Sequence, residues 1–584
     1  MKKCLLVLLL AGLCSCSPST RRAATSHDWS EPADPAGESP AAAWSAVEGF
    51  NVSFGSIDAR YPRSQPFAGA PMREHNLVGW KGEKLSAQAV VWTSAEVKDL
   101  ECKVGDFVSA DGAKLKDIAR ARFVKYVLSD QFNRKKPCGA RQPGEPSHLS
   151  ADMLDEVTTL TVPAKTARPV WITVEVPRDA KAGRYRADVE IKGAGVKPRT
   201  LTLNLEVTGR TLPKPSEWAY HLDLWQHPAA VARVQGVDVW SDEHFRLMKP
   251  LMRMLADAGQ KVITTNVNKE PWNNQCYDAY ADMIIWTKHP DGTWEYDFKV
   301  FDRWVEFMMG LGVNKMINCY SMLPWNNMLH YKDAATGKFV DVKADPGTPE
   351  FREMWAPFLP AFQKHLREKG WLKITNIAMD ERSAEHMAAA TSLLAEVAPE
   401  LGIALADNKK IFKKYPHIKD MCASIFGPID HADILERRAK GLTTTFYVCC
   451  SSEFPNTFTF SDPAEAVYLS WHAAAHDYDG MLRWTYNSWT AAPIRDSRFR
   501  TWAAGDTYIV YPECRSSIRF ERLVEGIQDW EKIRLLKREL SAGDATSREK
   551  LEAFESLLSA FRKASRTDGW NDRLNEAKQL LNTL

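Results

Sequence analysis

The 584-residue sequence is poor in several features that mark particular classes of protein. Its 76 Lys and Arg nearly balance its 74 Asp and Glu, and the formal net charge of +2 predicts no nucleic-acid partner. Neither CxxC nor HExxH occurs, so a structural or hydrolytic zinc site has no support. No GxGxxG turn follows a predicted strand, which argues against a dinucleotide-binding sheet. We therefore expect no metal and no cofactor.

Long apolar runs are missing as well, because no segment approaches the ~18 apolar residues of a transmembrane helix. The short run Leu5–Leu10 follows two lysines and is typical of a signal peptide. It leads to Leu13–Cys16, which resembles the lipobox of bacterial lipoproteins. We predict that residues 1–16 are a lipoprotein signal peptide and that a lipid on Cys16 anchors the chain to a membrane. Ordinary cleavage nearby is the alternative.

Residues 17–45 are rich in Ser, Pro, Ala and Gly, and we expect them to form a flexible tether. The tether begins without the acidic run that is often seen in surface-exported lipoproteins. A lipid-anchored location in the cell envelope is therefore predicted, on the periplasmic side rather than at the cell surface.

Two domains with different patterns follow the tether. In residues 46–212, short β-branched or alternating runs are separated by turn residues, which predicts a β-sandwich. Both Cys102 and Cys138 fall in this domain, so a disulfide between them is conceivable, although the sequence does not fix the pairing. In residues 216–512, strands alternate with amphipathic helices. Eight units of this kind predict a (β/α)8 TIM barrel, and an open doubly wound sheet is the alternative.

The eight candidate strands of the barrel are Trp218–Trp225, Lys261–Asn268, Lys315–Met322, Lys373–Glu381, Gly402–Asn408, Asp420–Phe426, Thr443–Cys450 and Met481–Trp489. Residues 513–584 form a helical C-terminal region, because Ile518–Arg538 and Arg548–Ala564 carry apolar residues at spacings of three and four. We expect the charges in these helices to face solvent. The fold class is thus a multidomain chain with a β-sandwich, a TIM barrel and a helical extension.

Catalytic residues of such barrels lie at the C-terminal ends of the strands. Polar and aromatic side chains collect at several of these predicted ends, and the chain has 21 Trp. Carboxylates and carboxamides bind hydroxyl groups, whereas aromatic rings cover the CH faces of sugars, so this composition favours a polyhydroxylated ligand. The predicted substrate-binding residues are Asp223, Trp225, Asn266, Tyr320, Trp325, Asp407, Asn408, Trp484, Asn487 and Trp489.

Asp380 and Glu381 close the apolar fourth strand and are the predicted catalytic residues. Glycosidic cleavage needs an acid to protonate the leaving oxygen and a group that stabilises positive charge at the anomeric carbon. Neighbouring carboxylates raise each other's proton affinity, which helps keep one of them protonated. Successive strand side chains point to opposite faces, so both can reach one ligand only if the strand bends at its end. A substrate that supplies its own nucleophile, a 2-acetamido group, would suit this arrangement.

The sequence resembles glycoside hydrolase family 123. The resemblance rests on the Asp-Glu pair that closes the fourth strand and on three further runs, Trp484–Trp489, Gly505–Pro512 and Ser517–Trp530. The last run is similar to a domain of unknown function that ends these proteins. The pair alone is less specific, since family 20 hexosaminidases also carry one.

The resemblance implies a retaining exo-β-N-acetylgalactosaminidase with a substrate-assisted mechanism. By position, Asp380 would orient and stabilise the acetamido group, and Glu381 would act first as the general acid and then as the base. Tyr486 could hydrogen-bond the acetamido carbonyl. The expected partner is a glycan that ends in β-linked GalNAc, on an oligosaccharide or a glycolipid. A glycosidase of other specificity (β-GlcNAc or endo-acting) and a non-catalytic glycan-binding lipoprotein are the alternatives; the intact pair argues against the second.

Overall fold

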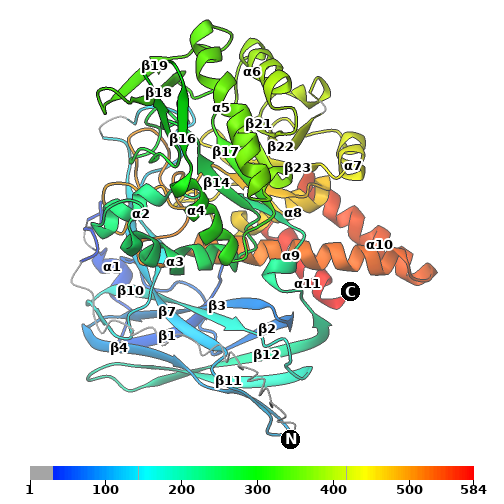
Figure 1. The fold of residues 1–584 in the computed structure, drawn as a ribbon. Coiled ribbons are helices and arrows are strands. Elements are labelled where there is room, and N and C mark those ends of the chain that lie inside the picture. The colour runs from blue at the N-terminus through cyan, green and yellow to red at the C-terminus, as the bar shows by residue number, and fades with distance from the viewer. Residues whose placement is uncertain (1–29, 38, 142–143, 416) are drawn as a thin grey trace, which may run out of the picture.

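The computed structural model describes residues 30–37, 39–141, 144–415 and 417–584. The predicted signal peptide with Cys16, and the tether up to residue 29, lie outside the described residues. Within the described ranges, no helix is long and apolar enough to cross a membrane. The N-terminal strands, the barrel above them and the C-terminal helices are distinct in Figure 1.

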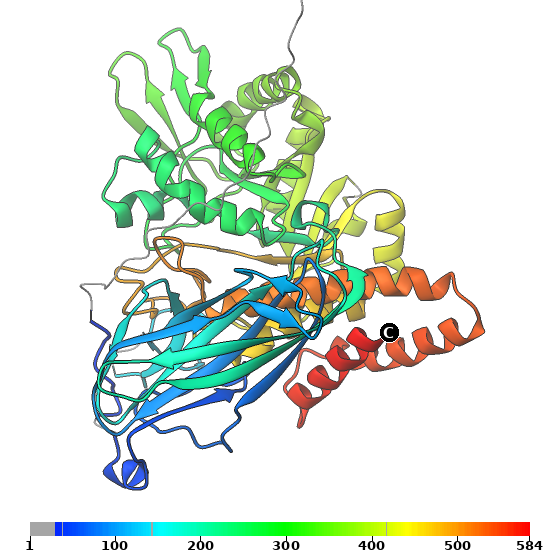
Figure 2. The same ribbon diagram turned by 90° about the horizontal axis from the view of Figure 1, so that it is seen from below.

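The N-terminal domain consists of two packed sheets (Figure 2). The first has the order β1 (Phe50–Gly55), β3 (Lys84–Thr93), β10 (Thr166–Glu175), β7 (Ala119–Ser129) and β8 (His148–Asp155). The second has the order β2 (Glu74–Lys81), β12 (Arg199–Thr211), β11 (Gly183–Lys192), β4 (Val97–Val104) and β9 (Leu160–Val162), with the short β5 (Phe107–Ser109) and β6 (Lys114–Leu115) beside β11. In β11 buried and exposed residues alternate, whereas β3 is buried along almost its whole length. The first sheet is therefore covered on both faces, by the second sheet and by the rest of the chain.

The second domain is a barrel of eight parallel strands, which confirms the prediction. Each strand lies beside its neighbours in chain order, as a (β/α)8 barrel requires. The strands are β13 (His221–Leu224), β14 (Val262–Asn266), β17 (Met316–Tyr320), β20 (Thr375–Met379), β21 (Gly402–Asp407), β22 (Ile418–Ser424), β23 (Thr443–Tyr447) and β24 (Gly480–Arg483). Six of the seven connections between the strands contain an α-helix, and in the described residues the connection after β21 contains only the short η3 (Ile411–Lys413). The helices before the last strand are α2 (Pro228–Gln235), α3 (Asp242–Ala256), α4 (Lys299–Gly310), α5 (Pro349–Glu368), α6 (Ala384–Val397), α7 (His431–Ala439) and α8 (Pro463–His476).

Glutamine side chains complete the seam where β13 meets β14. The backbone contributes one bridge there, between Leu222 and Gln260. The Gln260 side chain accepts a hydrogen bond from Leu224 N at 3.0 Å. The Gln226 side chain accepts one from Thr264 N at 2.9 Å. Because all of these groups are buried, the two amides satisfy backbone donors that a continuous ladder would otherwise satisfy.

A four-stranded sheet that the sequence did not predict rises from the barrel at the top of Figure 1. Its strands are β15 (Ile285–Lys288) and β16 (Trp294–Asp297), from the connection after β14, and β18 (Met328–Asp333) and β19 (Phe339–Lys343), from the connection after β17. Trp286 packs against Phe358 of α5 with a centroid distance of 4.1 Å. The insertion thus extends two of the connections that belong to the catalytic end of the barrel.

Helix α9 (Ile518–Ser541) lies between the sandwich and the barrel (Figure 1), where it packs beside α8 and contacts β3 and β8. The predicted solvent exposure of its charges is wrong, because Arg519, Glu521, Arg522 and Lys532 are buried. Burial on both sides leaves the helix without a polar face, so each charge is paired instead. Two further helices, α10 (Ala545–Leu558) and α11 (Trp570–Thr583), cover its outer side.

The charges of α9 are paired mainly with the sandwich. Glu521 lies 3.1 Å from Arg122 and 3.4 Å from Lys84. Burial alone would raise the pKa of Glu521, but the charges of Arg122 and Lys84 outweigh it and hold the pKa below its usual value. Arg522 lies 2.6 Å from Asp58. The charged residues of the helix are therefore the contacts that fix the two domains together.

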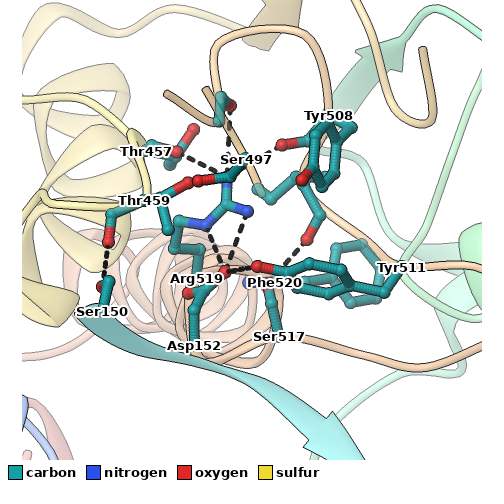
Figure 3. A network of polar contacts seen from close by, with 12 residues as sticks. Ser150, Asp152, Thr457, Thr459, Ser497, Tyr508, Tyr511, Ser517, Arg519 and Phe520 are labelled. Carbon is teal, nitrogen blue, oxygen red and sulfur yellow. Dashed lines mark hydrogen bonds and ion pairs between the residues drawn. The ribbon is translucent and has the colours of Figure 1, made fainter. Parts of the chain in front are cut away.

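Figure 3 shows the pair at the start of this helix, Arg519 with Asp152 of β8. The Arg519 Nε–H donates to Asp152 Oδ2 at 2.9 Å, and the Tyr511 hydroxyl donates to the same oxygen at 2.6 Å. The other side of the guanidinium donates to the backbone carbonyls of Thr457 and Tyr508, each at 2.8 Å. One arginine thus joins the sandwich to two loops of the barrel.

Replacing Asp152 by Ala is expected to lower the free energy of unfolding by about 3–5 kcal/mol, because it leaves the Arg519 charge buried without its carboxylate. Urea unfolding measures this change. The control Glu206→Ala removes an exposed partner of Arg184 at 3.3 Å and should cost less than about 1 kcal/mol. Equal losses of unfolding free energy in the two variants would contradict the conclusion that buried ion pairs of α9 hold the domains together.

Candidate active site

A cavity of about 530 Å³ opens at the C-terminal ends of the barrel strands. Side chains from most of the strand connections line it, as in other barrel enzymes. The lining residues that carry polar or aromatic groups include Trp225, Trp272, Trp325, Asp380, Glu381, Asn408, Tyr447, Trp484, Trp502 and Asp506. The cavity is thus a pocket with indole walls and carboxylates at its base.

Asp380 and Glu381 both line the pocket because the strand ends before them. The last residue of β20 is Met379, and the chain bends at Glu381 before α6 begins at Ala384. The alternation of strand side chains therefore no longer applies to the pair. The bend that both carboxylates need in order to reach one ligand is therefore present.

The carboxyl group of Asp380 accepts hydrogen bonds from an indole and from the backbone. The Trp325 Nε1–H donates to Asp380 Oδ2 at 3.1 Å, and the backbone N–H of Glu381 donates to Oδ1 at 3.2 Å. Burial raises the pKa of Asp380 to about 6; the Trp325 hydrogen bond opposes this rise, and the nearby Glu381 charge adds to it. Asp380 therefore changes charge within the range in which most enzymes work.

Glu381 has a different partner, since the hydroxyl of Tyr447 donates a hydrogen bond to its Oε1. Tyr447 is the last residue of β23, which lies three strands along the barrel from β20, the strand that precedes Glu381. This contact engages one oxygen of the Glu381 carboxylate. The two carboxylates thus have separate environments, although they are adjacent in the chain.

Aromatic rings form the walls of the pocket. Trp225 packs against Trp272 and Tyr320 at centroid distances of 5.1 and 4.4 Å. On the other side Trp484 meets Trp502 edge to face at 5.8 Å. Such surfaces suit the CH faces of a sugar ring, and their rigidity means that little side-chain entropy is lost on binding.

A buried ion pair holds Trp484 in place. Its Nε1–H donates to Asp506 Oδ2 at 3.1 Å, and the guanidinium of Arg483 lies 3.2 Å from Asp506 Oδ1. Burial raises the pKa of Asp506, and the charge of Arg483 opposes the rise. The end of β24 (Gly480–Arg483) therefore supplies Arg483 and is followed directly by Trp484, and Asp506 of a later loop orients the indole.

The predicted binding residues divide into three groups. Trp225, Trp325, Asn408 and Trp484 line the pocket together with Asp380 and Glu381. Tyr320, Asp223 and Asp407 are buried and do not appear among its lining residues. Burial first, and then the Asp420 charge, raises the pKa of Asp223 well above its usual value.

The remaining predicted residues contact other parts of the protein instead of the pocket. Tyr486 is fully buried, its hydroxyl donates to Leu251 O at 3.1 Å, and it is not among the residues that line the pocket. Trp489 donates to Val510 O at 2.8 Å. Asn487 accepts from His227 N at 2.9 Å, and Asn266 donates to Ala281 O at 3.4 Å. After Trp484 the chain turns into the core, which separates Tyr486, Asn487 and Trp489 from the pocket.

Sequence reasoning missed four residues of the pocket, Trp272, Tyr447, Trp502 and Asp506. A signal existed for Tyr447, which lies within the predicted strand Thr443–Cys450 near its end. Trp272 and Trp502 lie in long connections without a regular pattern, so their positions depend on the folded chain. Asp506 belongs to the run Gly505–Pro512, which contributes to the family resemblance but gave no sign of a place in the pocket.

The predicted possibility of a Cys102–Cys138 disulfide is wrong. Cys138 is bonded to Cys450, with a Cα–Cα distance of 5.3 Å, and Cys102 is free. Cys102 lies in β4 of the outer sheet, whereas the loop of Cys138 reaches the barrel. Both bonded cysteines line the pocket, so the disulfide fixes a sandwich loop at its rim.

Replacing Trp325 by Phe is expected to shift the pH dependence of catalysis. The change removes the indole donor that stabilises ionised Asp380, so its pKa should rise above about 6. Because the neutral acid cannot stabilise a cation, kcat/KM falls as pH drops through this pKa. The acid limb of the pH profile should therefore move up, by about one pH unit for a hydrogen bond to a charged group.

The matched control is Trp502→Phe, which removes an indole from the same pocket. Its Nε1–H donates to Gln275 O at 3.0 Å and has no carboxylate partner. This variant should weaken binding and leave the acid limb where it is. If the acid limb of the pH profile stays in place in Trp325→Phe, that limb belongs to a group other than Asp380.

A (β/α)8 barrel with paired carboxylates in an aromatic pocket at the C-terminal strand ends fits a glycoside hydrolase. Residues 225–536 match the model of the glycoside hydrolase 123 catalytic domain, and residues 54–193 match that of the family's N-terminal domain. The chain therefore belongs to glycoside hydrolase family 123. This confirms the resemblance noted in the sequence and the interpretation of the chain as an enzyme.

Comparison with solved structures agrees with this assignment. A family 123 glycoside hydrolase from Clostridium perfringens, whose study concerns glycolipid glycan hydrolysis, is similar with a TM-score of 0.82 and 26% identity over 92% of this chain and 97% of that chain. A family 5 xyloglucanase from Bacteroides ovatus has a TM-score of 0.28 and 10% identity over 82% and 100% of the two chains, and supports no inference. No curated protein matches.

Proposed function

We propose that the protein is a retaining exo-β-N-acetylgalactosaminidase that uses the 2-acetamido group of its substrate as the nucleophile. The observation that carries the proposal is the position of Asp380 and Glu381, which are adjacent in the chain and line one pocket. An acid and a nucleophile of the ordinary kind stand on opposite sides of the scissile bond. Adjacent residues at one strand end reach the same side more readily, which suits a substrate-assisted reaction.

The proposed first step forms a bicyclic oxazolinium ion. The acetamido oxygen attacks the anomeric carbon, the bond to the leaving oxygen breaks, and Glu381 transfers its proton to that oxygen. Asp380 accepts a hydrogen bond from the acetamido N–H and stabilises the positive charge that spreads onto nitrogen. Its environment supports this role, because the Trp325 indole favours the ionised carboxylate.

In the second step Glu381 acts as the base. It takes a proton from water, which attacks the anomeric carbon and reopens the bicyclic ion. Two displacements at one carbon give net retention of configuration. The Tyr447 hydroxyl, bonded to Oε1, leaves the other oxygen of Glu381 for both proton transfers.

A glycolipid glycan that ends in β-GalNAc is the proposed natural substrate. The studied relative from Clostridium perfringens acts on glycolipid glycans. The aromatic walls, with Trp484 and Trp502 at one side, provide apolar surface for the sugar next to the scissile bond. This extension to glycolipids rests on the relative and on the lining of the pocket together.

Hydrolysis of three aryl glycosides tests the proposal. Aryl β-GalNAc should be cleaved, aryl β-GlcNAc more slowly, and the plain β-galactoside not at all, because it lacks the acetamido group. NMR of the product should show the β-anomer first. Efficient cleavage of the galactoside would overturn substrate assistance, preference for β-GlcNAc would change the specificity, and no cleavage of any substrate would favour a glycan-binding role.

We also propose that the chain is lipid-anchored in the cell envelope through Cys16, on the periplasmic side. The support is the sequence Leu13–Cys16 after a short apolar run. Cys16→Ser should release the protein from the membrane fraction and abolish incorporation of labelled palmitate, whereas Cys14→Ser, two residues earlier, should change neither. A Cys16→Ser protein that is still acylated would contradict the assignment.

A further inference from the structure

Five lysines surround a hollow of about 720 Å³ at the end of the barrel opposite the active site. They are Lys261, Lys315, Lys373, Lys419 and Lys440. The only acidic residue among the lining residues is Glu217, which accepts a hydrogen bond from Lys214 N at 3.1 Å. Because the chain as a whole has a formal net charge of only +2, this concentration of positive charge is local.

The barrel topology brings the lysines together. Lys261 and Lys315 directly precede β14 and β17, and Lys373 lies in η2 (Leu372–Ile374) just before β20. Lys419 is the second residue of β22. Since parallel strands all begin at the same end of a barrel, these positions meet around one opening. The strands are about 17 Å long, so the hollow is well separated from the pocket.

Most of these charges lack a counter-charge. In the described part of the chain, Lys315, Lys373 and Lys419 have no carboxylate within 4.0 Å, although many other lysines do. Lys261 donates to the backbone carbonyl of Pro215 at 3.3 Å. Lys440 is paired with Glu436 on the outside of α7. The hollow therefore presents ammonium groups whose hydrogen-bonding capacity is largely unused.

Buried neutral groups at the same hollow are also unpaired. Asn376 is 1% exposed and His221 is 8% exposed, and both line the hollow. Asn376 Oδ1 and His221 Nε2 have no hydrogen-bond partner, and His221 Nε2 lies 3.9 Å from Asp420. The Asn376 oxygen can only accept a hydrogen bond, so the attraction of the hollow for an anion comes from its lysines and not from this amide.

The electrostatics of Lys261 agree with this geometry. Burial lowers the pKa of Lys261 to about 8, with a further contribution from the Lys315 charge, while Glu531 opposes the shift. Glu531 itself is held 2.8 Å from Arg534. Like charges without a counter-ion are costly in a partly buried site, and an anion would remove that cost.

We propose that this hollow binds a multiply charged oxyanion of the phosphate class. Lysine is a common phosphate ligand because its ammonium group acts as a compact point charge with three donors. Here several ammonium groups approach one concave space from different strands. A free phosphate and the phosphate of a lipid headgroup share this chemistry, and the experiment separates them.

Pyrophosphate binding to the full chain, measured by isothermal titration calorimetry, tests the proposal. The variant K315Q/K373Q/K419Q removes three charges and leaves a polar amide on a slightly shorter side chain at each position. The matched control K103Q/K116Q/K197Q removes three exposed sandwich lysines that also have no carboxylate within 4.0 Å in the described residues. We expect the first variant to bind at least tenfold more weakly and the control to bind like the wild type.

Two further readouts keep the test decisive. At pH 8 the bound anion should favour charged Lys261, so binding should take up protons and its enthalpy should depend on the buffer. The single substitution K373E should weaken binding even if the triple variant folds poorly. Wild type without saturable pyrophosphate binding, or equal losses in the triple variant and its control, would overturn the proposal.

Vesicles identify the source of the phosphate. The Cys16→Ser chain avoids any contribution from an acyl chain and is mixed with phosphatidylglycerol vesicles or with neutral phosphatidylcholine vesicles. Sedimentation with the anionic vesicles alone, lost in K315Q/K373Q/K419Q, would assign a lipid headgroup. Pyrophosphate binding without sedimentation would assign a free phosphate. Both results support an oxyanion site.

Discussion

Replacing Glu381 by Gln is expected to lower kcat by about 10²–10⁴-fold, the usual contribution of general acid catalysis. The amide keeps the shape of the side chain and can still accept from the Tyr447 hydroxyl, but it has no proton to transfer to the leaving oxygen. Loss of activity should therefore reflect chemistry and not the geometry of the pocket. Steady-state kinetics with aryl β-GalNAc substrates measures the effect.

The leaving group provides the internal control for this prediction. A nitrophenolate needs little protonation, whereas an alkyl alcohol needs much, so the loss should be smaller for the nitrophenyl substrate. Azide should increase turnover of the nitrophenyl substrate, because it attacks the oxazolinium ion without a base. Equal losses for good and poor leaving groups would move the acid role to another residue.

Replacing Asp380 by Asn should lower kcat to a similar extent, with a much smaller effect on KM. The amide can still hydrogen-bond but carries no charge, so it stabilises the oxazolinium ion far less than the carboxylate does. The change also removes the group whose pKa is raised to about 6, so the acid limb of the pH profile should disappear. Kinetics of kcat and of kcat/KM between pH 4 and 9 measure both effects.

Inhibition and substrate electronics separate this role from simple positioning. A thiazoline analogue of the bicyclic ion should inhibit the wild type strongly and Asp380→Asn weakly. Trifluoroacetylation of the substrate nitrogen should slow the wild type steeply, because it withdraws electrons from the attacking oxygen. A covalent ester trapped on any carboxylate would contradict the mechanism.

The eight barrel strands could be predicted because each is a short β-branched or apolar run between amphipathic helices. The place of Asp380 and Glu381 at the pocket could be predicted because they interrupt such a run at its end. These are local patterns, and they survive in the folded chain. The inserted sheet could not be predicted, since strands such as Trp294–Asp297 are four residues long and have no clear period.

The parts of the site that escaped prediction depend on contacts between distant segments. Trp484 and Trp489 belong to one aromatic run, but only Trp484 lines the pocket, because the chain turns inward between them. The same reason explains Cys138, whose partner Cys450 lies 312 residues away. The charges of α9 look like those of a surface helix, and only the packing of two domains against it explains their burial.

Helix α9 also affects how active members of the family can be found in genomes. It contains most of the run Ser517–Trp530, by which the resemblance was recognised, yet in the described structure none of its residues lines the pocket. The presence of that run in a sequence therefore indicates that the two domains pack together, but it does not indicate that the site is active. A search that relies on it would also retrieve descendants that have lost hydrolysis, so a catalogue of working enzymes should be filtered on Asp380, Glu381 and the indole of Trp325.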